Sequence, residues 1–295
     1  MSSNSIYLEQ HIPNQLERCW KTFRENTISV FGLWCLCLLI LITLFSPWIS
    51  PYGPQFQTGQ LLLPPSWDTI GSVDYFLGTD DLTRDMLSRL IAGARLTFGY
   101  AVLVALAAGV IGVFIGALAG MTSGLKSSLL HHLLDTVLSI PSLLLAIIVV
   151  AFYGPGELSI MLAIWLALIP RFIRSVYTAV HAEMEKEYIL SSRLDGANNF
   201  YLLYYSVLPN IFVTLNTELV RAISVAILDI AALGFLGLGA QAPSPEWGAM
   251  LGDSIEFVFT APWTVTLPGL AIMISVLVVN LVGQGLTQAI NSGTE

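Results

Sequence analysis

The ionisable side chains best placed for chemistry in this chain lie inside an apolar run. Glu218, Arg221 and Asp229 all fall between Ile211 and Leu238. At about 100° per residue, a helix places Glu218 and Asp229 nearly one above the other, with Arg221 within roughly 80° of both. Ionisable groups in a lipid-embedded helix are costly and usually face a cavity or a partner helix. Two interpretations remain open: a structural ion pair between Glu218 and Arg221, or a polar lining of a translocation path.

Other groupings of reactive residues give weaker indications. An intramembrane protease would need a pair such as Asp135 and Asp229, but two isolated carboxylates on separate runs are little support for a catalytic site. Gly120 to Ser127 could be mistaken for a phosphate-binding loop, but Lys126 does not directly follow a glycine and no strand precedes it. Cysteine and histidine show no metal-ligand spacing. We therefore expect no catalytic residue, no metal site and no cofactor bound by this chain.

The elements that position these residues are predicted membrane spans. Of 295 residues, 55% are hydrophobic and only 11% are charged, against about a quarter charged in soluble domains. Six apolar runs reach the roughly 20 residues that a helix needs to cross hydrocarbon. The sequence predicts an all-α polytopic membrane protein with six transmembrane helices, at Ile28–Ile49, Leu96–Met121, Leu133–Tyr153, Leu158–Val180, Ile211–Leu238 and Val265–Ile290.

Basic residues predict the orientation of these spans. With the N-terminus inside, only Arg84, Arg89 and Arg95 lie outside, and most Lys and Arg flank the inner ends of the runs. Both termini are therefore predicted to be cytoplasmic. The expected segments are a cytoplasmic N-terminal segment (1–27), the first span (28–49), a periplasmic segment (50–95) and a five-span core (96–290) with a periplasmic loop (239–264).

A short helix is predicted before the first span. Leu16, Trp20 and Phe23 recur at helical spacing beside a basic flank, which favours a helix lying in the membrane interface. A disordered polar leader is the alternative. Farther along, Pro141 is expected to interrupt the third span, because proline cannot donate the helical hydrogen bond.

Residues 181–210, between the fourth and fifth runs, are too charged to enter lipid. A helix is predicted from Glu183 to Leu194, ending at Gly196, which suits a left-handed C-terminal cap. Pro209 then interrupts the chain just before the fifth run. In an energy-coupled transporter, a motor outside the membrane must grip the membrane subunit. A short rigid helix between spans offers such a handle, so we expect 181–210 to be a coupling segment.

This segment resembles that of the permeases of oligopeptide and dipeptide ABC transporters. Their motif combines Glu-Ala-Ala, Gly and Leu-Pro. Here Leu190-Ser191-Ser192 replaces the Glu-Ala-Ala part, whereas Gly196 and Leu208-Pro209-Asn210 remain. The resemblance implies an ATPase contact through Glu187, Tyr188, Ser191, Ser192, Arg193, Gly196, Leu208 and Pro209.

Further motifs extend the resemblance over most of the chain after Leu77. They are Leu77-Gly78-Thr79-Asp80-Asp81 with Arg84-Asp85 and Ser88-Arg89, the run Phe235–Gly239 with Pro243-Ser244-Pro245-Glu246-Trp247-Gly248, and Pro268-Gly269 with Asn280, Gly283 and Gly285. Thr83 stands where Gly is usual, and Gln284 where Asp is common. Within the family, the likeness is to the second membrane subunit of Sap-type permeases, through Leu62–Trp67, Ser139–Leu145 and Ala226–Ala232.

The resemblance implies a fold and a set of partners. The fold is that of a type I ABC importer permease in a bacterial inner membrane. The partners are a second permease subunit, two ATP-binding subunits that hold ATP and Mg, a periplasmic substrate-binding protein and membrane lipid, with no nucleic acid. Peptides, including antimicrobial peptides, are the implied cargo. The alternatives are polyamines or another small solute on the same architecture, or an ion-coupled secondary transporter using Glu218 and Asp229.

Overall fold

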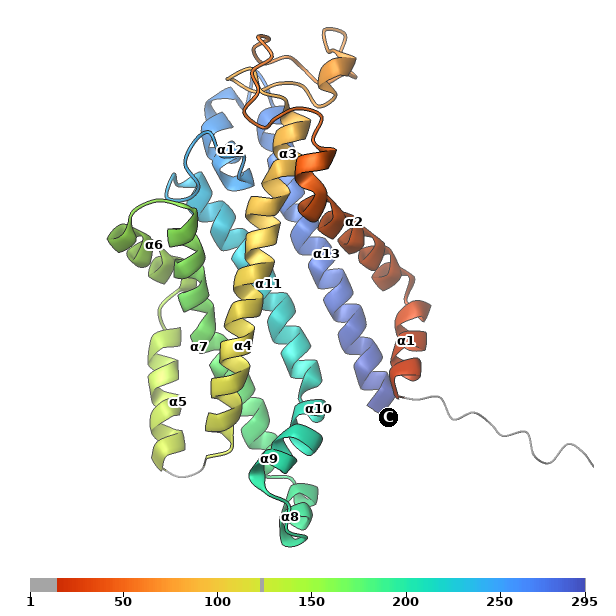
Figure 1. Ribbon diagram of the computed structural model, residues 1–295, viewed down its shortest axis with the longest axis vertical. Coiled ribbons are helices and arrows are strands. Elements are labelled where there is room, and N and C mark those ends of the chain that lie inside the picture. Colours follow the sequence, from red (N-terminus) through yellow and green to blue (C-terminus); the bar gives the residue numbers. More distant parts are fainter. Residues whose placement is uncertain (1–14, 123–124, 295) are drawn as a thin grey trace, which may run out of the picture.

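The computed structural model describes residues 15–122 and 125–294 as an elongated bundle of helices (Figure 1). Residues 1–14 of the predicted N-terminal segment, and part of the glycine-containing stretch 120–127, lie outside the described residues. A loop and α12 (Trp247–Ser254) occupy one end of the bundle. The short helices α8 to α10, together with α1 and the end of α13, occupy the other end (Figure 1). The described residues form no β-strand, only the isolated bridges Gln57–Arg84 and Thr79–Asp85.

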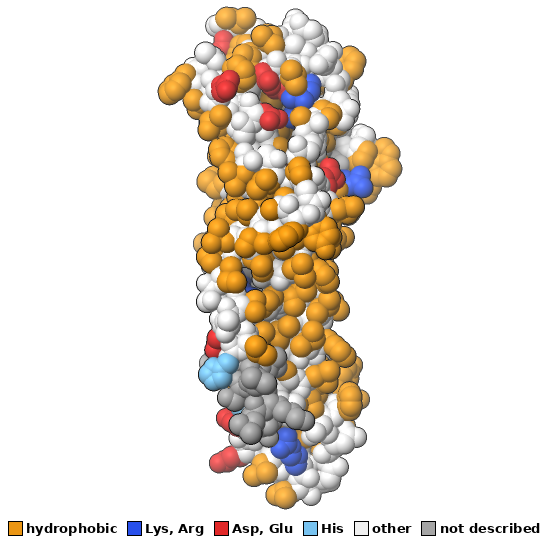
Figure 2. Space-filling view, turned by 90° about the vertical axis from the view of Figure 1, so that its left-hand side faces the viewer, with side chains coloured by type: hydrophobic (Ala, Val, Ile, Leu, Met, Phe, Trp, Pro, Cys, Tyr) orange, Lys and Arg blue, Asp and Glu red, His pale blue; other side chains and the backbone are white. Residues whose placement is uncertain are grey.

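Four helices among the described residues are long and apolar enough to cross a membrane. They are α2 (Thr27–Ile49), the continuous helix Met86–Gly120, α7 (Glu157–Met184) and α13 (Trp263–Thr294). Met86–Gly120 consists of α3 (Met86–Ala94), a π-helical turn η2 (Arg95–Gly99) and α4 (Tyr100–Gly120). On the face seen in Figure 2, hydrophobic side chains cover the middle of the molecule and most charged groups lie toward its ends.

Two further predicted spans differ from these four. The third is broken: α5 (Leu125–Leu138) and α6 (Ser142–Tyr153) meet at a 79° bend. The predicted interruption at Pro141 is confirmed, since Pro141 is the extended residue before α6. The fifth is α11 (Phe212–Phe235), in which every stretch of 18 residues contains Glu218, Arg221 and Asp229. These charges keep α11 out of the apolar set, although it is long enough to span.

Glycines hold α4 against α7. A Cβ at Gly112 would lie 2.2 Å from the Phe172 Cβ, and one at Gly116 would lie 2.8 Å from the Ile173 carbonyl oxygen. Small residues let membrane helices approach closely, so that dispersion and backbone contacts can hold them together. The Gly112, Gly116 and Gly120 spacing therefore brings α7 against α4, and α7 in turn carries the predicted coupling segment.

The cap loop (residues 50–85) is ordered by contacts between its side chains and the neighbouring helices. An ion cluster joins the loop to α3: Arg84 Nε lies 2.6 Å, and Arg89 Nη1 of α3 lies 3.4 Å, from Asp80 Oδ2. All three side chains are buried. Trp263 at the start of α13 donates from Nε1 to the Thr79 carbonyl oxygen at 3.2 Å. The helix after the loop begins at Met86, earlier than the apolar run at Leu96, because the Asp85 carboxylate caps it through the Ser88 N–H at 2.8 Å.

Glu246 joins α12 to the helix Met86–Gly120. Its carboxylate accepts hydrogen bonds from the Gly248 and Ala249 N–H groups and from Thr97 Oγ1, at 2.9, 2.8 and 2.7 Å. Although burial raises the pKa of Glu246, its three donors favour the ionised form. Trp247 donates from Nε1 to the Leu90 carbonyl oxygen at 3.0 Å. The stretch 243–248 thus holds two distant parts of the chain together.

The predicted N-terminal helix is confirmed as α1 (Gln15–Glu25). Phe23 is buried, and a Cβ at Gly285 of α13 would lie 3.1 Å from its ring. Leu16 and Trp20 are exposed. The position of α1 in a membrane interface stays a prediction.

Candidate coupling element and polar groove

The predicted coupling segment folds as a helix, a turn and a second helical stretch. These are α8 (Glu187–Leu194), then α9 (Asn199–Tyr201), the π-helical turn η3 (Leu202–Val207) and α10 (Leu208–Asn210). The predicted start of the first helix at Glu183 was wrong. α7 continues to Met184, and Lys186 adopts an extended conformation that separates it from α8. The reason is that Glu183 is buried in the last turn of α7, where its carboxylate accepts a hydrogen bond from Tyr188 of α8.

A polar cluster fixes the bend between α7 and α8. Glu183 Oε1 accepts a hydrogen bond from the Tyr188 hydroxyl at 2.5 Å, and Oε2 lies 2.7 Å from Lys186 Nζ. The Tyr188 oxygen in turn accepts from Asn210 Nδ2 at 3.0 Å. Burial and the hydrogen bond to Glu183 raise the pKa of Tyr188, so the phenol stays protonated and keeps donating. Three helices, α7, α8 and α10, are therefore tied together by one tyrosine.

Beneath this cluster lies a small apolar core. Ile189 from α8 and Leu202 and Val207 from η3 are fully buried, and they pack with Val176 and Val180 of α7. The outer surface is different, because Leu190, Leu194 and Phe200 are 60%, 82% and 76% exposed. The element is thus anchored on its inner side and presents apolar side chains on its outer side.

The residues predicted to contact the ATPase lie in α8, in the turn after it and in α10, and most of them are exposed. Gly196 has φ +92° and a Cβ there would meet nothing within 4 Å, so glycine serves the backbone turn and not a tight contact. The predicted end of the helix at Gly196 is confirmed. Ser192 and Leu208 are half-buried, whereas the other predicted residues are exposed, namely Glu187, Tyr188, Ser191, Arg193, Gly196 and Pro209.

The three charges of α11 separate into two environments. Arg221 donates from Nη2 to Glu218 Oε1, which forms the predicted ion pair. Glu218 and Asp229 are 6% and 9% exposed. The positive charge of Arg171 in α7 attracts both carboxylates, and Ser142 of α6 forms a hydrogen bond with Asp229. The two acids therefore face the neighbouring helices of this chain, whereas the Arg221 side chain remains 39% exposed.

Arg221 opens onto a groove between α11 and α13, the polar groove, of about 690 Å³. Asn280 of α13 links the two helices, because its Nδ2 donates a hydrogen bond to Ser224 Oγ of α11 at 2.9 Å. The polar side chains that line it are Thr217, Arg221, Ser224, Asn280, Gln284, Thr287, Gln288, Asn291 and Ser292. Sequence reasoning missed most of these as site residues. The available signal was the amide at every fourth position, Asn280, Gln284 and Gln288, which lines one face of a helix.

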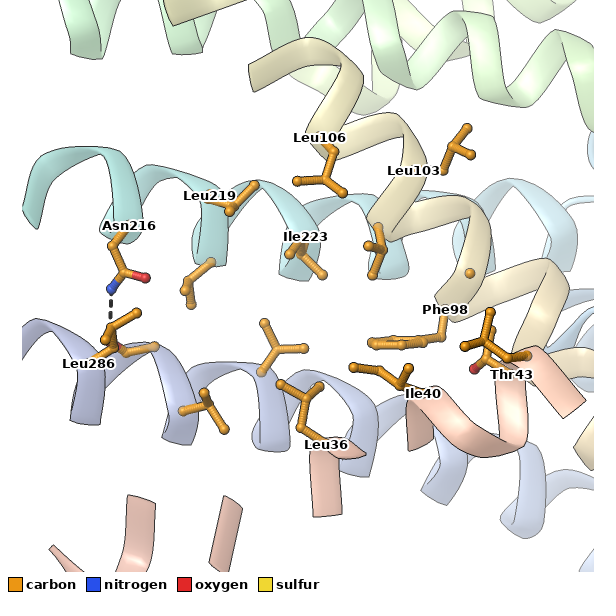
Figure 3. Close-up of a pocket in the computed structure, with 17 residues that line it drawn as sticks. Leu36, Ile40, Thr43, Phe98, Leu103, Leu106, Asn216, Leu219, Ile223 and Leu286 are labelled. Atoms are coloured by element: carbon orange, nitrogen blue, oxygen red, sulfur yellow. Dashed lines mark hydrogen bonds between the residues drawn. The ribbon is translucent and has the colours of Figure 1, made fainter. Parts of the chain in front are cut away.

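A second groove on the bundle is apolar. It measures about 630 Å³ and lies among α2, α4, α11 and α13 (Figure 3). Leu36, Ile40, Phe98 and Ile223 are among its walls. Its polar residues are already engaged: Asn216 Nδ2 donates to the Gly283 carbonyl oxygen at 3.0 Å (Figure 3), and Thr43 Oγ1 donates to the Leu39 carbonyl oxygen at 2.7 Å. The polar groove thus differs from its neighbour in offering groups that can bind a polar molecule.

A bundle of apolar helices that carries a short helical element at one end is the arrangement predicted for a membrane subunit of a transport system. Residues 112–295 match the family described as "Binding-protein-dependent transport system inner membrane component", and residues 14–65 match "N-terminal TM domain of oligopeptide transport permease C". The chain belongs to this family of binding-protein-dependent inner membrane components.

Individual relatives extend the likeness over the whole chain. A protein of Escherichia coli O6:H1 named "Peptide transport system permease protein SapC" is 55% identical over 296 residues, covering 100% of both chains. The "Di/tripeptide transport system permease protein DppC" of Pseudomonas aeruginosa is 43% identical, covering 95% of this chain and 92% of the relative. The predicted resemblance to the oligopeptide and dipeptide permeases, and to their Sap-type branch, is confirmed.

A solved structure shares the fold. It shows "Inward facing conformations of the MetNI methionine ABC transporter", and one of its chains matches with TM-score 0.60 and 18% identity, covering 70% of this chain and 97% of that chain. The helical bundle therefore has the type I ABC importer permease fold, as predicted.

Proposed function

We propose that this chain is the membrane-spanning permease subunit of a peptide ABC transporter and forms half of the translocation path. The observation that carries the proposal is the 55% identity, over the full length of both chains, to a peptide transport system permease. In this proposal, the chain works in a bacterial inner membrane with a second permease subunit, two ATP-binding subunits and a periplasmic substrate-binding protein. ATP and Mg bind to the ATP-binding subunits, and this chain catalyses no reaction.

The proposed topology has six spans with both termini cytoplasmic. The spans are α2, Met86–Gly120, the bent pair α5 and α6, α7, α11 and α13. Arg18, Lys21 and Arg24 flank the first span on the proposed inner side, as the positive-inside rule favours. Of the three proposed outer arginines, Arg84 and Arg89 are both paired with the buried Asp80. The cap loop and the loop 239–264 are then periplasmic, and residues 1–27 and 181–210 cytoplasmic.

The proposed coupling runs from the ATPases through α8 to the spans. The exposed side chains Leu190, Leu194 and Phe200 suit an apolar cleft on the ATPase. The cluster of Glu183, Tyr188 and Asn210 makes the element stiff, because it links α8 to the ends of both neighbouring spans. Closure of the ATPases on ATP would then move α7 and α11 together and expose the path to alternate sides of the membrane.

Two measurements test the proposal. Purification of the tagged chain in mild detergent, followed by identification of the bound subunits, should return a second permease and two ATP-binding subunits. The complex in proteoliposomes, given its binding protein, should then move a radiolabelled tripeptide only when ATP is supplied. Transport by this chain alone would contradict the proposal.

Gly196 variants test the coupling surface. A leucine at Gly196 would project from the exposed turn, because a Cβ there meets nothing within 4 Å. We expect Gly196→Leu to weaken ATPase co-purification, and Gly196→Asn, which tolerates positive φ better, to weaken it less. Equal co-purification of the ATPases with wild type and with both variants would place the docking surface elsewhere.

A further inference from the structure

The polar groove between α11 and α13 cannot face lipid. Arg221 lies nine residues after the start of α11 and Gln284 ten before the end of α13, about 14 Å along each helix. Among the described residues, the exposed amide of Gln284 has no hydrogen-bond partner. An unpaired amide in hydrocarbon costs several kcal/mol, so this surface requires water or a polar molecule.

The groove is also one-sided in charge. Among the described residues that line the groove, Arg221 alone is charged, and none of them is an acid. The two acids of α11, Glu218 and Asp229, are buried behind it against α7 and α6. The amides of Asn280, Gln284 and Gln288 add both donors and acceptors. Such a surface suits a molecule that combines carbonyl and N–H groups with a negative end, and it offers nothing to neutralise a polycation.

We infer that the polar groove receives the peptide in transit, with Arg221 contacting its C-terminal carboxylate and the amides of Asn280, Gln284 and Gln288 contacting its main chain. This rests on the proposed function and narrows the cargo from peptides or polyamines to molecules with a free carboxylate. The volume of about 690 Å³ lies in the range of small-molecule sites.

Arg221 has the geometry for this contact because Glu218 occupies one side of its guanidinium only. The ion pair uses Nη2, and a guanidinium carries five N–H donors in a planar fork. The remaining donors can bind a carboxylate from the groove while Glu218 fixes the side chain. Glu218 is thus a positioning residue, and Arg221 the binding residue.

The test compares two substrates in the reconstituted complex with its binding protein. A tripeptide with a free C-terminus and the same tripeptide with a C-terminal amide are offered at equal concentrations, and spermidine is offered separately. The wild-type complex should transport the free acid preferentially and spermidine least. The double variant Glu218→Gln/Arg221→Gln removes both charges without leaving a lone buried acid, and it should abolish the preference for the acid. Gln284→Leu should lower transport of both peptides by about tenfold, the effect of one or two lost hydrogen bonds.

The control is Thr266→Leu, which removes an exposed polar group from the same helix but outside the groove. It should transport both peptides as wild type does. If wild type moves neither peptide, the proposed function fails. If wild type moves both but the groove variants keep full rate and preference, only the groove assignment fails. If Gln284→Leu loses the second permease on purification, the groove is a subunit interface and the inference is overturned.

Discussion

At the residue scale, the sequence reveals contacts within one helix and misses those between helices. The Glu218–Arg221 pair is three residues apart, so the helical period alone predicts it, and the structure contains it. Arg171, which acts on both Glu218 and Asp229, lies on another span. Nothing in the spacing of residues along α7 indicates which part of α11 it will face, because that depends on how the two helices pack.

Tyr188 gives the sharpest test of the bend between α7 and α8. Tyr188→Phe removes the hydroxyl that donates to Glu183 and accepts from Asn210, at a cost of about 1 kcal/mol. We expect the ATPases still to bind and hydrolyse ATP, while transport per ATP falls because α8 moves without α7. The measurement is the ratio of peptide moved to phosphate released.

Tyr204→Phe is the matched control for this ratio. Its ring is 67% exposed in the same element and contacts Tyr205. The ratio should equal that of wild type. A similar fall in both variants would show that the effect belongs to the exposed surface and not to the bend.

Glu246 is expected to be the costliest single carboxylate to remove. Glu246→Ala leaves two backbone N–H groups and the Thr97 hydroxyl without their acceptor in a buried position. The expected destabilisation is about 3 kcal/mol, seen as a lower midpoint of thermal unfolding in detergent. Glu256→Ala, at an exposed position in the same loop, should leave the midpoint unchanged.

At the scale of elements, most helices were predictable and their ends were not. Apolar length predicts α2, α7 and α13, because crossing hydrocarbon requires it. The early start of the helix at Met86 depends on the Asp85 cap, and the late end of α7 on the buried Glu183. Both ends are set by side-chain hydrogen bonds formed only in the folded chain. The amides of α13 were visible in the sequence as a period of four, but only the groove beside α11 shows their use.

The close contact between α4 and α7 predicts that a Gly→Ala substitution there lowers stability, which is the opposite of its usual effect in a helix. Gly→Ala normally stabilises a helix by about 1 kcal/mol. At Gly116 the new methyl would lie 2.8 Å from both the Ile173 carbonyl oxygen and the Val176 Cβ. Gly116→Ala should therefore destabilise the protein by about 1–3 kcal/mol, measured by thermal unfolding in detergent.

Gly269→Ala is the comparison for that substitution. Gly269 is also inside a long helix, and the nearest atom to a Cβ there is 3.9 Å away. This variant should be as stable as wild type or more so. A loss of stability at both positions would show that helix packing is not the cause.

At the scale of the whole molecule, the proposed orientation is open to direct labelling. In a chain whose three cysteines are replaced by alanine, Val73→Cys lies in the exposed cap loop and Ser292→Cys near the end of α13. A membrane-impermeant maleimide should label Val73→Cys on intact spheroplasts and Ser292→Cys only after the membrane is opened. Labelling of both from outside would rule out cytoplasmic termini.

The cap loop also sets an order for biogenesis. Its buried Asp80 follows Thr79, whose carbonyl oxygen accepts a hydrogen bond from Trp263, and the Leu90 carbonyl oxygen of the following helix α3 accepts one from Trp247. These tryptophans lie 184 and 157 residues downstream, so the ribosome makes the loop long before its supports. A polypeptide released before residue 263 would reach the bilayer with the cap loop lacking the Trp263 hydrogen bond, which gives quality-control proteases a means to tell truncated products from complete ones.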